Sequence, residues 1–187
     1  MAAGVGQDPV VEPFDGEWLV IIDPQAIFTS PAISAWGSPM WASTVPHVLE
    51  LAAAYGPERT IVTRYVADPG LGGSWEPYLR EWPFALVPDS DPLYAVIPEL
   101  SGLAERVVTE PTFGKWGPAL VKITGRAPRL AVAGVSTDCC VIATALPAGD
   151  AGAWVRVVER ACAGSTRQNH KRAIGAMALF SPQIVIV

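Results

Sequence analysis

Short apolar runs alternate with longer amphipathic stretches along most of the chain. Six runs rich in β-branched residues and bounded by turn residues predict buried strands. They are EWLVIID (17–23), RTIVTRYV (59–66), RVVTE (106–110), RLAVAGV (129–135), AWVRVVE (153–159) and QIVIV (183–187). Helical spacing predicts helices over 44–56, 137–152 and 167–180, and Thr137 or Asp138 is well placed as the N-cap of the second. Residues 67–92, rich in Pro, Gly and Trp, predict a long loop segment.

This alternation predicts an α/β fold with a mainly parallel, six-stranded sheet. Successive strand, helix and strand units form right-handed crossovers, which place helices on both faces of such a sheet. A chain of 187 residues without an internal repeat or linker fits a single domain over residues 1–187, with 1–16 as a flexible N-terminal extension.

Charge and composition favour a small-molecule substrate. The net charge of −5 leaves no basic stripe for nucleic acid and no polybasic patch for a membrane surface. The N-terminal stretch lacks the features of a signal peptide, and no apolar run has the length of a membrane span. We therefore expect a cytoplasmic protein that binds neither nucleic acid nor membrane.

The cysteines and histidines predict neither a metal site nor a disulfide framework. Cys139, Cys140 and Cys162 have no metal-ligand spacing, and the two histidines are too few for most zinc sites. We expect no metal and no cofactor.

Ligands of parallel α/β sheets bind beyond the carboxyl ends of the strands. Asp23, Arg64 and Glu110 follow or close three of the predicted strands, and residues 136–140 follow the fourth. We expect these side chains to converge on one crevice.

Three residues of this edge suggest nucleophilic chemistry. Asp23 is either a turn residue before Pro24 or a general base that accepts a thiol proton. Cys140 lies in the first turn of a helix, where the backbone N–H groups and the dipole favour a thiolate. Lys115 is either a solvated loop lysine or the cation that supports this pair.

The other two cysteines are expected to be packing residues. Cys139 and Cys162 would lie in the core, as most free cysteines do. A disulfide between Cys139 and Cys140 would need a strained ring, so a vicinal redox pair is the poorer alternative.

The motifs Asp23-Pro24-Gln25, Gly-Val-Ser-Thr-Asp-Cys-Cys-Val (134–141) and Thr-Ala-Leu (144–146) resemble the isochorismatase-like cysteine hydrolases. This superfamily includes nicotinamidases, N-carbamoylsarcosine amidases and isochorismatases. The resemblance implies a Rossmann-like three-layer α/β/α fold and a homo-oligomer, a dimer or tetramer. It also implies an Asp, Lys, Cys triad with Cys140 as nucleophile, a cis peptide between Val135 and Ser136, and an oxyanion held by the N–H groups of Ser136 and Cys140.

The chain departs from the family pattern at the lysine. Glu110 stands where the family carries it, and Lys115 lies five residues later. Either Lys115 folds back to supply the ammonium, or the triad is altered and the activity is reduced or different. A second departure is that the segment after the second strand has no histidine, which argues against zinc or iron and makes nicotinamide a less favoured substrate.

The remaining candidates are substrate-binding residues at the same edge of the sheet. Aromatic side chains in its loops suggest an apolar pocket wall or a dimer contact, and Arg64 could pair with an anionic substrate or form a structural ion pair. The candidates are Gln25, Arg64, Trp75, Trp82, Glu110 and Trp116.

The predicted function is hydrolysis of a C–N bond in an amide, carbamoyl or lactam-like small molecule, by way of a thioester acyl-enzyme. The alternatives are vinyl-ether hydrolysis of an isochorismate-like compound, in which the aspartate protonates the substrate, and a catalytically impaired binding or regulatory protein.

Overall fold

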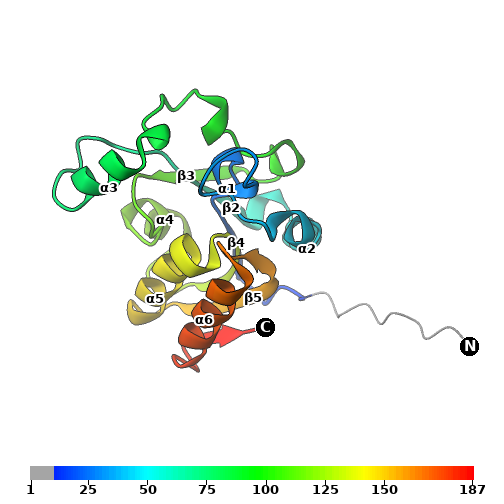
Figure 1. The fold of residues 1–187 in the computed structure, drawn as a ribbon. Helices are drawn as coiled ribbons and strands as arrows, with labels where there is room; N and C mark the ends of the chain where they lie inside the picture. Colours follow the sequence, from blue (N-terminus) through cyan, green and yellow to red (C-terminus); the bar gives the residue numbers. More distant parts are fainter. Residues whose placement is uncertain (1–10) are drawn as a thin grey trace, which may run out of the picture.

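A computed structural model describes residues 11–187. The core is one six-stranded sheet in the order β3-β2-β1-β4-β5-β6, in which every pair of neighbouring strands is parallel (Figure 1). The strands are β1 (Trp18–Ile22), β2 (Thr60–Tyr65), β3 (Arg106–Glu110), β4 (Arg129–Val135), β5 (Trp154–Ala163) and β6 (Ile184–Ile186). The prediction of a parallel six-stranded sheet is confirmed.

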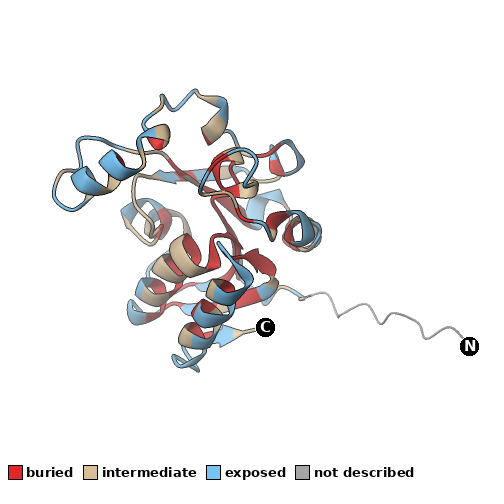
Figure 2. Cartoon of the chain, in the orientation of Figure 1, coloured by how far each residue is buried: buried red, intermediate tan, exposed pale blue. Residues whose placement is uncertain are grey.

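Helices cover both faces of the sheet and complete three layers. Leu19 and Ile21 of β1 pack into the core on one face, beneath α1 (Ala26–Thr29) and α2 (Trp41–Tyr55). Val20 and Ile22 face the opposite core, which is covered by α4 (Pro118–Thr124), α5 (Ile142–Asp150) and α6 (Arg167–Ala178). Because β1 is buried on both sides (Figure 2), its sequence is apolar throughout rather than alternating.

The order of the strands reverses at β1, which pairs with β2 on one side and with β4 on the other. In open parallel sheets, the crevice for ligands lies beyond the carboxyl ends of the strands at this reversal. The segments that follow β1, β2 and β4 therefore meet at the place where we expected the functional residues to converge.

Several short elements were missing from the sequence prediction. Besides α1 and α4, the segment predicted as a loop holds α3 (Trp75–Glu81). Four 3-10 helices each begin with a proline, and they span Pro57–Arg59, Pro83–Ala85, Pro92–Tyr94 and Pro98–Leu100. Helices of three to seven residues contain too few positions to establish a helical period, so the hydrophobic pattern could not reveal them.

The predicted helix over 137–152 is two elements, and its predicted N-cap is wrong. A π-helical turn, Thr137–Val141, precedes α5. Ser136 occupies the N-cap position without a side-chain capping bond. The Asp138 carboxylate instead accepts hydrogen bonds from the backbone N–H and the hydroxyl of Ser165 (2.7 and 2.6 Å), so it links this turn to the segment after β5.

Residues 1–10 of the expected N-terminal extension lie outside the described residues. Residues 11–16 form neither helix nor strand, and they contact the sheet, because Arg156 of β5 donates a hydrogen bond to the Glu12 carbonyl (3.0 Å). No helix within residues 11–187 has both the length and the apolar character needed to span a membrane.

Candidate active site

Asp23 lies immediately after β1 and is completely buried. Its φ of 44° places the backbone in the left-handed region, which turns the chain sharply at the end of the strand. The Thr63 hydroxyl of β2 donates to Asp23 Oδ1 (2.6 Å) and accepts a hydrogen bond from the Asp23 backbone N–H (3.1 Å). The neighbouring strand therefore fixes the orientation of the carboxylate.

Lys115 is also completely buried, and its ammonium lies against the other carboxylate oxygen. Lys115 Nζ is 3.1 Å from Asp23 Oδ2 and donates to the Thr112 carbonyl (2.5 Å). The Lys115 backbone N–H donates to the Thr144 hydroxyl (2.9 Å), which itself donates to the Cys140 carbonyl (2.7 Å). One chain of contacts thus connects the lysine to the helix that carries Cys140.

A glycine lets the lysine segment approach this helix closely. A Cβ atom at Gly114 would lie 2.6 Å from the Ala143 carbonyl oxygen, so any side chain at that position would collide with backbone. Glu110, five residues before Lys115, is the last residue of β3 and is half-buried. The sequence left open whether Lys115 supplies the ammonium or the triad is altered. In the structure Lys115 folds back and places its ammonium against Asp23.

Cys140 and Cys139 both line a cavity beyond the carboxyl ends of the strands. Cys140 is buried, whereas Cys139 is partly buried. Cys139 packs against the core on this side of the sheet, as predicted, and it also lines the cavity, which was not predicted. The π-helical turn explains the difference, because its wider spiral changes the direction of neighbouring side chains relative to an α-helix. Cys162 is buried in the core, as predicted.

The environment of Cys140 raises the pKa of its thiol. A hydrogen bond with Cys139, burial and the Asp23 carboxylate raise the pKa of the Cys140 thiol well above its usual range, and the Lys115 ammonium opposes this shift. The helix terminus was expected to favour a thiolate, and the hydrogen bond with Cys139, burial and the Asp23 carboxylate act against it. A reaction at Cys140 therefore needs a base to take its proton, and Asp23 is a nearby carboxylate.

The segment before Cys140 is held by the residues that follow β5. The peptide bond between Val135 and Ser136 is cis, as the family resemblance implied. Thr137 is buried, and its hydroxyl lies 2.9 Å from His170 Nδ1 of α6. The N–H groups of Cys139 and Val141 donate to the Ser136 carbonyl (3.1 and 3.0 Å).

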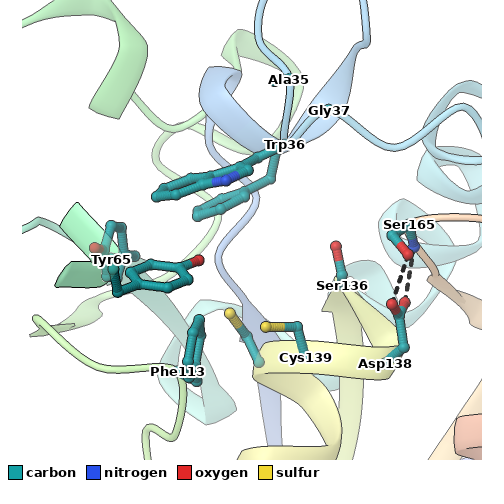
Figure 3. A pocket seen from close by; sticks show the side chains of 12 residues that line it. Ala35, Trp36, Gly37, Tyr65, Phe113, Ser136, Asp138, Cys139 and Ser165 are labelled. Carbon is teal, nitrogen blue, oxygen red and sulfur yellow. Dashed lines mark hydrogen bonds between the residues drawn. The ribbon is translucent and has the colours of Figure 1, made fainter. Parts of the chain in front are cut away.

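The cavity has a volume of about 250 Å³ and an uneven lining. Figure 3 shows Trp36, Tyr65 and Phe113 on one side and Asp138 with Ser165 on the other, with Ser136 and Cys139 between them. Asp23 and Lys115 are not part of the lining, because they are buried behind it. A small ligand would therefore meet the cysteines first.

None of the six residues predicted to bind substrate lines this cavity. Gln25 is buried and exchanges hydrogen bonds with the backbone of Tyr65, and it donates to the Tyr94 carbonyl (2.8 Å), so its amide holds strands and loop together. Arg64 forms an ion pair with Asp89, which is the structural alternative considered for it. The remaining four are Trp75, Trp82, Glu110 and Trp116.

The three tryptophans of that set have other surroundings. Trp75 packs on Phe113 (ring centroids 4.9 Å apart) and Trp82 packs on Trp36 (6.0 Å), so both stand behind rings that line the cavity. Trp116 lines a separate surface depression beside α4. An aromatic wall was predicted at this edge of the sheet, but the rings at its surface are not these three tryptophans.

A metal site does not fit the described residues. Within residues 11–187 no three or more His, Cys, Asp and Glu side chains are grouped so that they could hold an ion. His170 is engaged with Thr137, and His47 lies 3.5 Å from Glu50 on α2. We derive no step through a metal.

The family model described as the isochorismatase domain matches residues 17–186. The chain belongs to the isochorismatase family. None of the curated proteins compared with it matches.

Solved structures of isochorismatase-like proteins share the fold. An isochorismatase family protein from Desulfovibrio vulgaris is 23% identical, with a TM-score of 0.74 over 92% of this chain and 93% of that chain. A cysteine hydrolase from Pseudomonas syringae is 15% identical, with a TM-score of 0.73 over 97% and 94%. A nicotinamidase from Bacillus subtilis is 19% identical, with a TM-score of 0.71 over 91% and 99%. At sequence identities this low, the similarity to these structures shows a shared fold and nothing more specific.

Sequence reasoning missed some residues of this isochorismatase-family site. Thr63 carried a signal, because it is a polar residue within a buried strand next to the one that ends in Asp23. Phe113 and Ser165 carried none, since both lie in loops whose course depends on tertiary contacts.

Proposed function

We propose that the chain is a cysteine-dependent hydrolase that cleaves a C–N bond in a small amide, carbamoyl or lactam-like compound. The observation that carries this proposal is the fully buried ion pair between Lys115 Nζ and Asp23 Oδ2, 3.1 Å apart, behind a cavity lined by Cys140. A carboxylate and an ammonium are costly to bury, and chemistry at an adjacent thiol gives a reason to keep them there.

In the proposed reaction Asp23 takes the thiol proton while Cys140 Sγ attacks the substrate carbonyl carbon. The carbonyl oxygen becomes an oxyanion, which the N–H groups of Ser136 and Cys140 hold. The carboxyl proton then moves from Asp23 to the leaving nitrogen, the C–N bond breaks, and ammonia or an amine departs. A thioester on Cys140 remains.

The second half of the reaction uses the same carboxylate. Asp23 takes a proton from a water molecule that attacks the thioester carbonyl. The C–S bond breaks, the acid is released, and the proton returns to the Cys140 sulfur. Throughout, the Lys115 ammonium stabilises the ionised Asp23 and holds it in place.

Two of the similar structures support a C–N hydrolase, since one carries the name cysteine hydrolase and another nicotinamidase. The alternative of a catalytically impaired protein was based on Glu110, which stands at the usual lysine position. The position of Lys115 argues against this alternative. Vinyl-ether hydrolysis of a doubly charged isochorismate-like compound is less compatible with a cavity whose described lining holds no basic side chain.

The test is hydrolysis of a panel of small amides by the wild-type chain and by the Cys140→Ala variant. The variant should lose at least about 1,000-fold in kcat/KM, because no other group in the mechanism forms the thioester. Cys162→Ala serves as the matched control and should keep the wild-type rate, since that thiol is buried away from the cavity.

Iodoacetamide distinguishes the alternatives. Alkylation of Cys140 should abolish amide hydrolysis, with the modified peptide identified by mass spectrometry. Wild-type activity in the Cys140→Ala variant, or after complete alkylation, would contradict the proposal and favour chemistry by Asp23 alone.

A further inference from the structure

Five aromatic side chains surround the apolar side of the cavity. They come from four separate segments of the chain, so the fold brings them together at this one place. They are Phe28, Trp36, Tyr65, Tyr78 and Phe113.

Packing fixes these rings in place. Trp36 is at the centre and is stacked on Phe28 (centroids 6.0 Å apart) and on Tyr78 (5.9 Å). It also makes a T-shaped contact with Tyr65 (5.9 Å). Phe113 packs edge-on against Tyr78 (5.4 Å). Burial raises the pKa of both Tyr65 and Tyr78, so both phenols remain neutral at physiological pH. The wall is thus a preorganised set of aromatic faces and edges.

The charges at the cavity have one sign. Asp138 is the one ionisable carboxylate of the described lining, and no lysine, arginine or histidine among residues 11–187 lines the cavity. The Ser165 N–H and hydroxyl occupy two of the roughly four acceptor positions of the Asp138 carboxylate, so acceptor capacity remains.

The nearby cations do not change this balance. The Lys115 ammonium is buried against Asp23 and lies over the Tyr65 ring, 5.4 Å from its centroid, so that ring already has a cation and its charge is balanced by Asp23. The Arg64 guanidinium is turned to Asp89. A substrate carboxylate in the cavity would therefore have no cationic partner and would face Asp138. An ammonium group would meet aromatic π-faces and an uncompensated carboxylate, both of which attract a cation.

We propose that the aromatic side of the cavity binds an alkylated or quaternary ammonium group, so that the substrates are amides whose acyl part carries a positive charge. The proposal rests on the proposed hydrolase function for its reaction, since the amide carbonyl lies over Cys140 while the ammonium lies beside Trp36 and Phe113, away from the Tyr65 ring that Lys115 occupies. Asp138, on the opposite side, adds a negative potential across the cavity.

The test compares two ligands that differ in charge and share their shape. Trimethylammonioacetamide and tert-butylacetamide are titrated calorimetrically into the Cys140→Ala variant, which cannot turn them over. The ammonium compound should bind at least about tenfold more tightly than its neutral counterpart, because cation–π attraction adds to the shared apolar contact. The anion malonamate should bind most weakly. Equal affinities for the first two, or tighter binding of the neutral compound, would overturn the proposal.

Substitutions then show which side chains cause the preference for the ammonium compound. In the same background, Trp36→Leu or Phe113→Leu should bring the affinity ratio toward one, and Asp138→Asn should reduce the ratio without removing it. Trp154→Leu, at a tryptophan that is 55% exposed on β5, is the control and should leave the ratio unchanged. Circular dichroism checks that each variant is folded, and an unchanged ratio in both folded ring variants would overturn the assignment to the aromatic wall.

Binding and hydrolysis are measured separately, so the two proposals can fail independently. If the Cys140→Ala variant prefers the ammonium compound but the wild-type chain hydrolyses no amide of the panel, the hydrolase proposal fails and the ammonium site stands. If the wild-type chain hydrolyses amides but the Cys140→Ala variant does not prefer the ammonium compound, the ammonium site fails and the hydrolase proposal stands.

Discussion

Lys115 and Asp23 form a buried ion pair whose two members arrive from distant parts of the chain. The lysine comes from the loop after β3 and the aspartate from the end of β1, and neither side chain is exposed to solvent. Burying both charges is costly, and their mutual attraction offsets the cost only while both are present. The pair is therefore sensitive to the loss of either partner.

Replacing Lys115 by methionine tests whether this ammonium belongs to the site. The Lys115→Met variant leaves the Asp23 charge buried without its partner, so kcat/KM for a hydrolysed amide should fall by at least about 100-fold. The free energy of unfolding should decrease by about 3–5 kcal/mol. Steady-state kinetics and urea denaturation measure the two effects.

Glu110→Gln is the matched control for this variant. Glu110 stands at the position that the family resemblance assigns to the lysine but does not line the cavity, so its neutral isostere should keep the wild-type rate within about twofold. If Glu110→Gln loses as much activity as Lys115→Met, the role assigned to Lys115 is wrong.

The motif residues of this site could be found from the sequence because their spacing is local. Cys140 lies within one continuous signature, and Asp23 closes an apolar strand. The position of Lys115 could not be found in this way, because it depends on the close approach of Gly114 to Ala143 and on a hydrogen bond to Thr144 of α5. The surroundings of Cys139 depend on the π-helical turn, for which the sequence carries no signal.

The π-helical turn and α6 are coupled through one buried hydrogen bond. Thr137 Oγ1 lies 2.9 Å from His170 Nδ1, and on its other side the His170 ring lies 3.6 Å from Glu159 of β5. This contact holds the start of the turn that presents Cys140 to the cavity.

Thr137→Val removes the hydroxyl and keeps the shape of the side chain. The free energy of unfolding should fall by about 1–3 kcal/mol, because a buried ring nitrogen loses its partner. We expect kcat to fall more than KM changes, since the turn carries the proposed nucleophile and not the aromatic wall. Thr124→Val on α4, whose hydroxyl bonds within its own helix, should leave kcat unchanged. Equal kcat values for the two variants would contradict a positioning role.

At the scale of elements, the six strands and three longer helices were predictable because each carries a clear hydrophobic pattern. The boundaries shifted where tertiary contacts extend an element. Strand β5 continues to Ala163, since Gly134 and Val135 of β4 pair with Cys162 and Ala163 beyond an irregularity in the register. Such pairing depends on the neighbouring strand.

The whole molecule buries several groups that are neutral when protonated. Burial raises the pKa of the Cys162 thiol from 9.0 to about 12, and it raises the pKa of Tyr55 and Tyr65. The folded state therefore keeps these protons after the unfolded state has lost them. As the pH rises above 9, ionisation favours the unfolded chain, so stability should fall between pH 9 and 12.

Cys162→Ala isolates the contribution of one such group. Between about pH 9 and pH 10.5 the free energy of unfolding of the wild-type chain should fall more steeply than that of the variant, by at most about 1.4 kcal/mol per pH unit. Urea denaturation under reducing conditions at several pH values measures this difference. Parallel curves for the two proteins would show that Cys162 has no raised pKa in the folded state.

The close approach of Gly114 to α5 has a consequence for how relatives of this protein are recognised. It places an ammonium against Asp23 although the residue that supplies it lies five positions away from the usual one. A survey that scores residues by alignment column would miss this ammonium, whereas one that scores distances to the aspartate would find it. A buried ammonium can thus occupy the same place beside an aspartate while it comes from another position in the sequence.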